Sequence, residues 1–111
     1  MGGTISHLFN GTAKFSNGFD VNPSATCFHA NGRTATDGWA TDQDLALVAT
    51  HCTEVTSVSL GSCKLITEAG LKYLTSLPKL QFVDLTGCDQ LSKVMIERFI
   101  ESAPHVHKVV W

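Results

Sequence analysis

The chain has 111 residues and a formal net charge of −2, with 43% hydrophobic and 16% charged residues. This length predicts one domain with a modest core, and the composition is typical of a globular protein rather than a disordered one. The near-neutral charge gives no electrostatic reason to expect nucleic acid or an anionic membrane as a partner. No apolar run approaches the roughly 20 residues that a transmembrane segment requires, so none is predicted.

Residues 1–38 are predicted to form an irregular N-terminal arm or cap. The segment is rich in Gly, Asn, Ser and Thr, which favour turns, and it has no helical period. Its candidate anchors are four phenylalanines: Phe9, Phe15, Phe19 and Phe28. In one interpretation the segment folds back and the phenylalanines cap the apolar body that follows. In the other it extends as an arm, and they anchor it in grooves of a larger partner.

The first residues fit a loose N-myristoylation pattern, with Gly2 after the initiator methionine and Ser6 four residues later. No polybasic cluster follows to supply the second signal that stable membrane anchoring needs. The pattern at Gly2 still makes a lipid-anchored adaptor an alternative interpretation.

Residues 39–111 are predicted to form a repeat domain that begins with a helix. Thr41 is a suitable N-cap, and the carboxylate of Asp42 would lie near the exposed N–H groups of the first turn. Leu45, Val48 and Cys52 are spaced three and four residues apart, so they share one face of that helix.

The repeat itself is visible as one pattern that occurs twice: apolar, two residues, apolar, one residue, Leu, two residues, Cys. The copies are Val55, Val58, Leu60 and Cys63, and then Leu80, Val83, Leu85 and Cys88. Each position recurs after 25 residues, and a fixed period of this size is typical of stacked repeats. The apolar residues predict a short strand facing a core. The cysteine is expected to close the turn after the strand as a buried structural thiol, not as a nucleophile.

The second helix is predicted to follow Thr67, which corresponds to Thr41 in the preceding unit. Gly70 lies within it and costs roughly 1 kcal/mol relative to Ala, so we expect a close approach of the neighbouring repeat at this point. Leu71 and Leu74 would face the core, and Pro78 is expected to stop the helix.

A third unit completes the pattern. It is predicted to contain a helix from Ser92-Lys93, with Ile96 and Phe99 facing inward, ended by Pro104. A last strand is expected at Val106, Val109 and Trp111. Because the sequence ends within this strand, we expect its outer edge to be unpaired and available to a partner.

The run LGSCKLITEAGL, from Leu60 to Leu71, resembles the cysteine-containing class of leucine-rich repeats, whose pattern is L-x-x-C-x-x-I-T-D-x-G-L. The run from Leu85 to Ser92 is a second, weaker match. The resemblance implies an α/β fold, a short leucine-rich-repeat solenoid of about three repeats. Parallel strands would line its concave face and helices its convex face. F-box-associated receptors and adaptors carry such repeats, although residues 1–38 contain no recognisable F-box. In size and layout the chain is also similar to the mitochondrial ATP synthase factor B (subunit s) family.

Solenoids of this kind bind partners through the outward residues of the strand face, which the core does not need. The predicted partner-binding residues on this face and at its end are Ser57, Ser59, Phe82, Asp84, Thr86, Lys108, Val110 and Trp111. Phe82 has no core role in this register, so either the N-terminal segment or a partner is expected to pack on it. Asp84 and Lys108 would form a polar rim around that anchor.

The expected function is a non-catalytic protein–protein interaction module without a cofactor. The layout favours a small accessory or scaffolding subunit of a larger assembly, such as a mitochondrial respiratory-chain or ATP synthase complex; a ubiquitin-ligase-type adaptor is an alternative. A third alternative is a His/Cys metal-binding protein that uses the following pairs: Cys27 and His29, His51 and Cys52, His105 and His107. The absence of a C-x-x-C pair and the repeat positions of three of the four cysteines favour an intracellular, reducing compartment, mitochondrial or cytoplasmic.

Overall fold

A computed structural model of the chain describes residues 13–32 and 37–111. In chain order its elements are β1 (Cys27–His29), β2 (Gly38–Thr41), α2 (Asp42–His51), β3 (Ser57–Ser59), β4 (Cys63–Leu65), α3 (Glu68–Leu74), β5 (Phe82–Asp84), α4 (Lys93–Ser102) and β6 (Lys108–Val110). The predicted α/β class is confirmed, because this part of the chain combines a parallel sheet with three helices. Gly2 and Phe9 lie outside the described residues, so the predictions made on them stay predictions.

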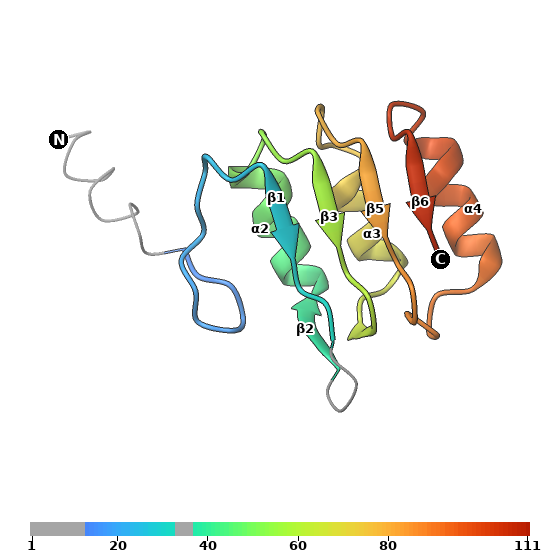
Figure 1. Cartoon of the computed structure of the whole chain (residues 1–111), viewed down its shortest axis with the longest axis horizontal. Coiled ribbons are helices and arrows are strands. Elements are labelled where there is room, and N and C mark those ends of the chain that lie inside the picture. Colours follow the sequence, from blue (N-terminus) through green and yellow to red (C-terminus); the bar gives the residue numbers. More distant parts are fainter. Residues whose placement is uncertain (1–12, 33–36) are drawn as a thin grey trace, which may run out of the picture.

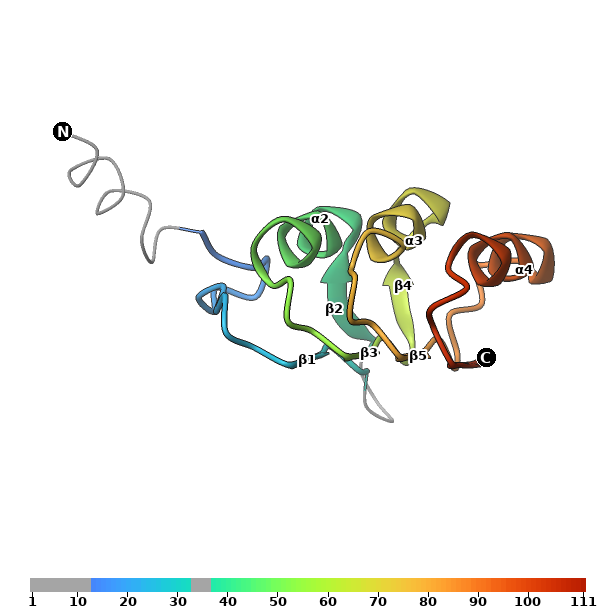
Figure 2. The same ribbon diagram turned by 90° about the horizontal axis from the view of Figure 1, so that it is seen from above.

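The main sheet has the strand order β1-β3-β5-β6, and each neighbouring pair is parallel. Figure 1 shows the four strands side by side, and Figure 2 shows α2, α3 and α4 together on one side of them. This arrangement follows from parallel pairing, because parallel strands need a crossover connection, and each helix supplies one. The central residues of the four strands stand in one register row and form the floor of the core under the helices: Phe28, Val58, Val83 and Val109.

Strand β1 lies within the segment that the sequence predicted to be an arm or cap. Its Phe28 is in register with Val58 of β3, and the amide of Ala30 donates to the carbonyl of Ser59 at 2.8 Å. The predicted boundary between residues 38 and 39 therefore falls inside β2 and separates β1 from the sheet to which it is hydrogen-bonded.

A second, two-stranded parallel sheet pairs β2 with β4. As the sequence predicted, Cys63 closes the turn after β3, since its amide donates to the carbonyl of Leu60 at 3.0 Å. Cys63 also begins β4 and stands in register with Gly38. A Cβ atom at position 38 would lie 2.3 Å from the sulfur of Cys63 and 2.4 Å from the carbonyl oxygen of Ala30. Only glycine allows the backbone to come this close, and this is what permits the pairing.

The predicted N-cap Thr41 is confirmed for α2. Thr67 and Ser92, where the sequence predicted the other two helices of the described chain to begin, are the N-caps of α3 and α4. Thr41 takes part in a capping box, because the carboxylate of Asp44 accepts from the amide of Thr41 at 2.9 Å while the Thr41 hydroxyl accepts from the amide of Asp44. The prediction that Pro78 stops the second helix is wrong, since α3 already ends at Leu74.

The close approach predicted at Gly70 is confirmed. A Cβ atom there would lie 2.3 Å from Oδ1 of Asp42 at the start of α2. That oxygen accepts from the amide of Thr67 at 2.8 Å, so the first turn of α2 also satisfies the start of α3. Gly70 is thus the position where the two helices meet. None of the described helices combines the length and apolarity that crossing a membrane requires.

Candidate functional site

The candidate site is the surface of the main sheet opposite the helices, called here the sheet face (Figure 2). Because side chains alternate along a strand, its residues form two rows in register across the four strands. The first row is Cys27, Ser57, Phe82 and Lys108, and the second is His29, Ser59, Asp84 and Val110. The structure therefore brings together six predicted residues from β3, β5 and β6.

The sequence prediction missed Cys27 and His29 as members of this face. They belong to it because β1 continues the sheet beyond β3, and both side chains are exposed. The signal was present in Phe28 and Ala30, which are buried and repeat the alternation of Val58 and Leu60. A 30-residue separation between Phe28 and Val58, in place of 25, hid it.

The predicted residues differ in how much of their surface is available. Lys108 is exposed, Phe82, Asp84 and Val110 are half-buried, and Trp111, just beyond β6, is 51% exposed. Ser59 offers little surface, because only 7% of it is exposed. It stands in register between His29 and Asp84.

Asp84 and Thr86 are tied to each other at the end of β5. Oδ1 of Asp84 accepts from the amide of Thr86 at 2.9 Å and from its hydroxyl at 2.6 Å. This is a local turn in which an aspartate bonds the backbone two residues ahead. Both predicted partner residues therefore have a structural role, and one oxygen of Asp84 is already engaged.

Two of the predicted anchors pack within the chain. The rings of Phe15, Phe28 and Trp39 form a cluster with centroid separations of 5.1 to 5.7 Å. Phe28 is buried at the centre of β1, whereas Phe19 is 72% exposed. Phe15 and Phe28 thus agree with the cap interpretation and Phe19 does not. The cluster contains Phe28 of β1, whereas Phe82 belongs to β5, two strands away in the sheet.

The segment carrying Phe15 is fixed to α2 by a buried carboxylate. Residues 13–21 form a tight antiparallel turn with a bridge between Lys14 and Asp20. Asp44, only 1% exposed, accepts from the backbone amide of Ser16 at 2.7 Å and from its hydroxyl at 2.5 Å. The described part of the N-terminal segment is therefore held against the body by polar contacts and aromatic packing together.

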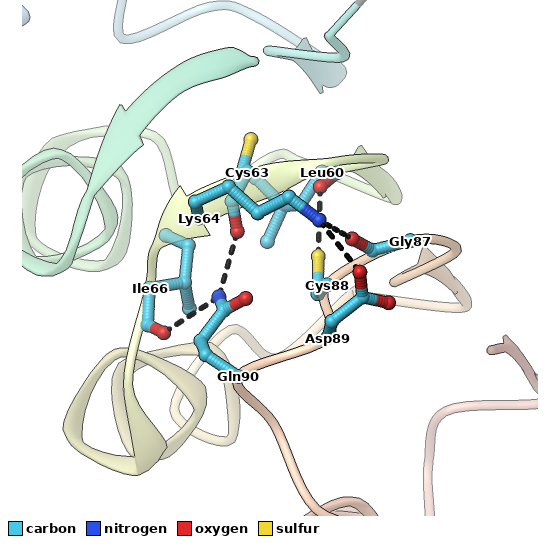
Figure 3. Close-up of polar contacts among 8 residues, drawn as sticks. All are labelled: Leu60, Cys63, Lys64, Ile66, Gly87, Cys88, Asp89 and Gln90. Carbon is cyan, nitrogen blue, oxygen red and sulfur yellow. Dashed lines mark hydrogen bonds and ion pairs between the residues drawn. The ribbon is translucent and has the colours of Figure 1, made fainter.

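The buried thiols of Cys63 and Cys88 act as hydrogen-bond donors to the unit before them. The thiol of Cys63 donates to the carbonyl of Ala30 at 3.0 Å, and that of Cys88 donates to the carbonyl of Leu60 at 3.0 Å (Figure 3). Burial raises the pKa of Cys63 to about 11 and also raises the pKa of Cys88. A thiol with a raised pKa is a poor nucleophile at neutral pH, which agrees with the structural role predicted for both.

Figure 3 also shows the polar contacts that join the turn after β5 to β4 and the residue that follows it. The side-chain amide of Gln90 donates to the carbonyls of Cys63 at 2.7 Å and Ile66 at 2.9 Å. The ammonium of Lys64 contacts the carbonyl of Gly87 and pairs with Asp89 at 3.0 Å. These polar groups are occupied within the chain.

Two further features of the described chain concern possible binding chemistry. Within residues 13–32 and 37–111, no group of three or more His, Cys, Asp or Glu side chains is placed to hold a metal ion. A groove of about 230 Å³ lies between α3 and α4, with Leu71, Met95 and Phe99 among its lining residues and the Glu68–Arg98 ion pair at its rim.

No protein-family model matches the sequence.

Proposed function

We propose that this protein is a non-catalytic protein–protein interaction module, a short leucine-rich-repeat solenoid that serves as a small accessory or scaffolding subunit of a larger assembly. The repeat spacing supports this architecture, together with the thiol bonds that link each turn to the strand before it. The partner would bind on the sheet face.

The observation that carries the proposal is the position of Phe82. This aromatic side chain is half-buried on a sheet surface that none of the described helices covers, and Lys108 stands beside it in register. Lys108 has no ion-pair partner among the residues that the structure describes. Aromatic side chains often contribute most of the binding energy of an interface, so Phe82 beside the unpaired Lys108 is the expected anchor.

The test is purification of the tagged full chain from the cells in which it is naturally expressed, with identification of the proteins that accompany it. Phe82→Ala and Lys108→Glu are compared with wild type, and Tyr73→Ala and Lys72→Glu on α3 are matched controls on the helical side. We expect the recovered amount of the accompanying protein to fall by about tenfold or more with the two sheet-face variants and to be unchanged with the controls.

All four variants are first checked for folding by circular dichroism and thermal unfolding. Equal recovery of the same partner with folded sheet-face variants would show that binding takes place elsewhere. A partner lost with Tyr73→Ala or Lys72→Glu, and retained with Phe82→Ala, would move the binding surface to the helices.

A further inference from the structure

Four residues on β5 and β6 form a rectangular patch on the sheet face, called here the β5–β6 patch. Strand register places Phe82 beside Lys108 and Asp84 beside Val110, and the two strands lie next to each other (Figure 1). Apolar residues therefore occupy one diagonal of the rectangle, and residues of opposite charge occupy the other.

Both charges are available for an external partner. Neither Asp84 nor Lys108 belongs to an ion pair with any described residue. The bonds of Asp84 to Thr86 both use Oδ1, and no hydrogen bond to its Oδ2 occurs in the described chain. Lys108 is exposed, so its ammonium can reach a group above the sheet.

We propose that the β5–β6 patch is a self-association site and that its occupant is the same patch of a second copy of this chain. The inference rests on the proposed function, because it names the partner of the sheet face. The argument is charge and shape complementarity under two-fold symmetry. A symmetric dimer uses one patch twice, and two sheets that face each other are related by a two-fold axis lying between them.

Only one orientation of that axis gives every residue of the patch a suitable partner. If the axis runs along the diagonal from Phe82 to Val110, each of these apolar residues meets its own copy. The same rotation places Lys108 of each chain against Asp84 of the other and forms two reciprocal ion pairs.

The other orientations leave mismatched contacts. An axis along the opposite diagonal puts Lys108 against Lys108 and Asp84 against Asp84, which is repulsive. An axis parallel to the strands puts Asp84 against Val110, and one perpendicular to them puts Lys108 against Val110. Each of these places a charge on an apolar side chain without a partner. The two residues on each strand lie about 6.6 Å apart and neighbouring strands about 4.8 Å apart, so this diagonal axis makes the strands of the two sheets cross at roughly 70°, nearer to orthogonal than to aligned sheet packing.

The patch is small, and small interfaces belong to weak complexes. The test is sedimentation equilibrium of the full chain from about 10 µM to about 1 mM, at low salt, since the ion pairs are solvent-accessible. We expect the average mass to rise from 12.0 kDa toward twice that value as the concentration rises. We also expect self-association to weaken at high salt.

Charge reversal provides the specific readout. Lys108→Asp alone and Asp84→Lys alone each put like charges opposite one another, and we expect each to weaken self-association by about tenfold or more. A mixture of the two single variants restores both ion pairs and should form a heterodimer. Lys108→Asp leaves the Asp84 turn intact, so it separates loss of binding from loss of folding. Glu97→Lys on the exposed side of α4 is the control and should behave like wild type.

A wild-type protein that stays monomeric over the whole range would overturn the self-association proposal. So would single variants that associate as well as wild type, or a mixture that does not associate. If the wild type is monomeric but the native purification shows a different protein lost with Phe82→Ala, the interaction module stands with another partner. If both experiments are negative, the sheet face has no binding role.

Discussion

Substituting Gly70 by alanine tests whether the contact between α2 and α3 has been read correctly. In an ordinary helix this change stabilises by about 1 kcal/mol, because alanine has the better helix propensity. Here the added Cβ would lie 2.3 Å from Oδ1 and 3.2 Å from Cγ of Asp42, and 3.0 Å from Cδ1 of Leu45. The carboxylate must move away, and it then gives up its bonds to the amide and hydroxyl of Thr67.

The expected magnitude follows from these opposing effects. Two solvent-accessible hydrogen bonds to a carboxylate are together worth about 2 kcal/mol, and the propensity gain offsets about half of this. We therefore expect Gly70→Ala to lower the free energy of unfolding by about 1 kcal/mol, or the melting temperature by about 4 °C for a chain of this size. Urea unfolding followed by circular dichroism measures it.

A double-mutant cycle with Asp42→Ala isolates the cause. Once the carboxylate is absent, the methyl group of Gly70→Ala has space, so the same substitution should become neutral or stabilising by up to about 1 kcal/mol. The contact with Leu45 is common to both backgrounds and cancels in the comparison. The reasoning fails if Gly70→Ala stabilises the otherwise native protein, or if its effect is the same in both backgrounds.

Two further predictions concern the buried polar groups. The unfolded Cys63 thiol ionises near its ordinary pKa of 9.0, whereas the folded one ionises near 11, so the free energy of unfolding should fall as the pH rises through this interval. Cys63→Ala should lessen that fall in pH-dependent urea titrations, and a pH dependence unchanged by the substitution would contradict it. Asp44→Ala removes the anchor of Ser16 and half of a capping box, so we expect a loss of about 1–2 kcal/mol and faster proteolysis within residues 13–21. Ser16→Ala keeps the capping box and should show a smaller loss of stability, and slow proteolysis of Asp44→Ala would refute the anchoring role.

The helices and the inner strands could be predicted because local signals and the period agree. Thr41, Thr67 and Ser92 are N-caps followed by residues with a helical period. Val58 and Val83 repeat with fixed spacing, and both face the core. Gly70 was informative because a residue that is unfavourable in a helix needs a packing reason.

The remaining features depend on contacts that the sequence does not display. Strand β1 has a longer connection to β3, and it is followed by Ala30 where β3 and β5 are followed by leucine, so the period does not reveal it. The pairing of β2 with β4 needs the absence of a side chain at Gly38, which a sequence shows only as one glycine among nine. The bond between Ser16 and Asp44 spans 28 residues, and Ser59 is buried although it lies on the outward side of β3.

The two thiol bonds at the turns make the two ends of the described chain unequal. Each runs from a cysteine back to the strand of the unit before it, from Cys63 to Ala30 and from Cys88 to Leu60. Detachment of β1 takes away the acceptor of Cys63 and leaves a buried thiol unpaired, whereas detachment of α4 and β6 breaks neither bond. Cooperativity is therefore unequal along the chain, since loss of the first strand is transmitted inward and loss of the last is not. In native-state hydrogen exchange this polarity would appear as a lower free energy of opening for β6 than for β1.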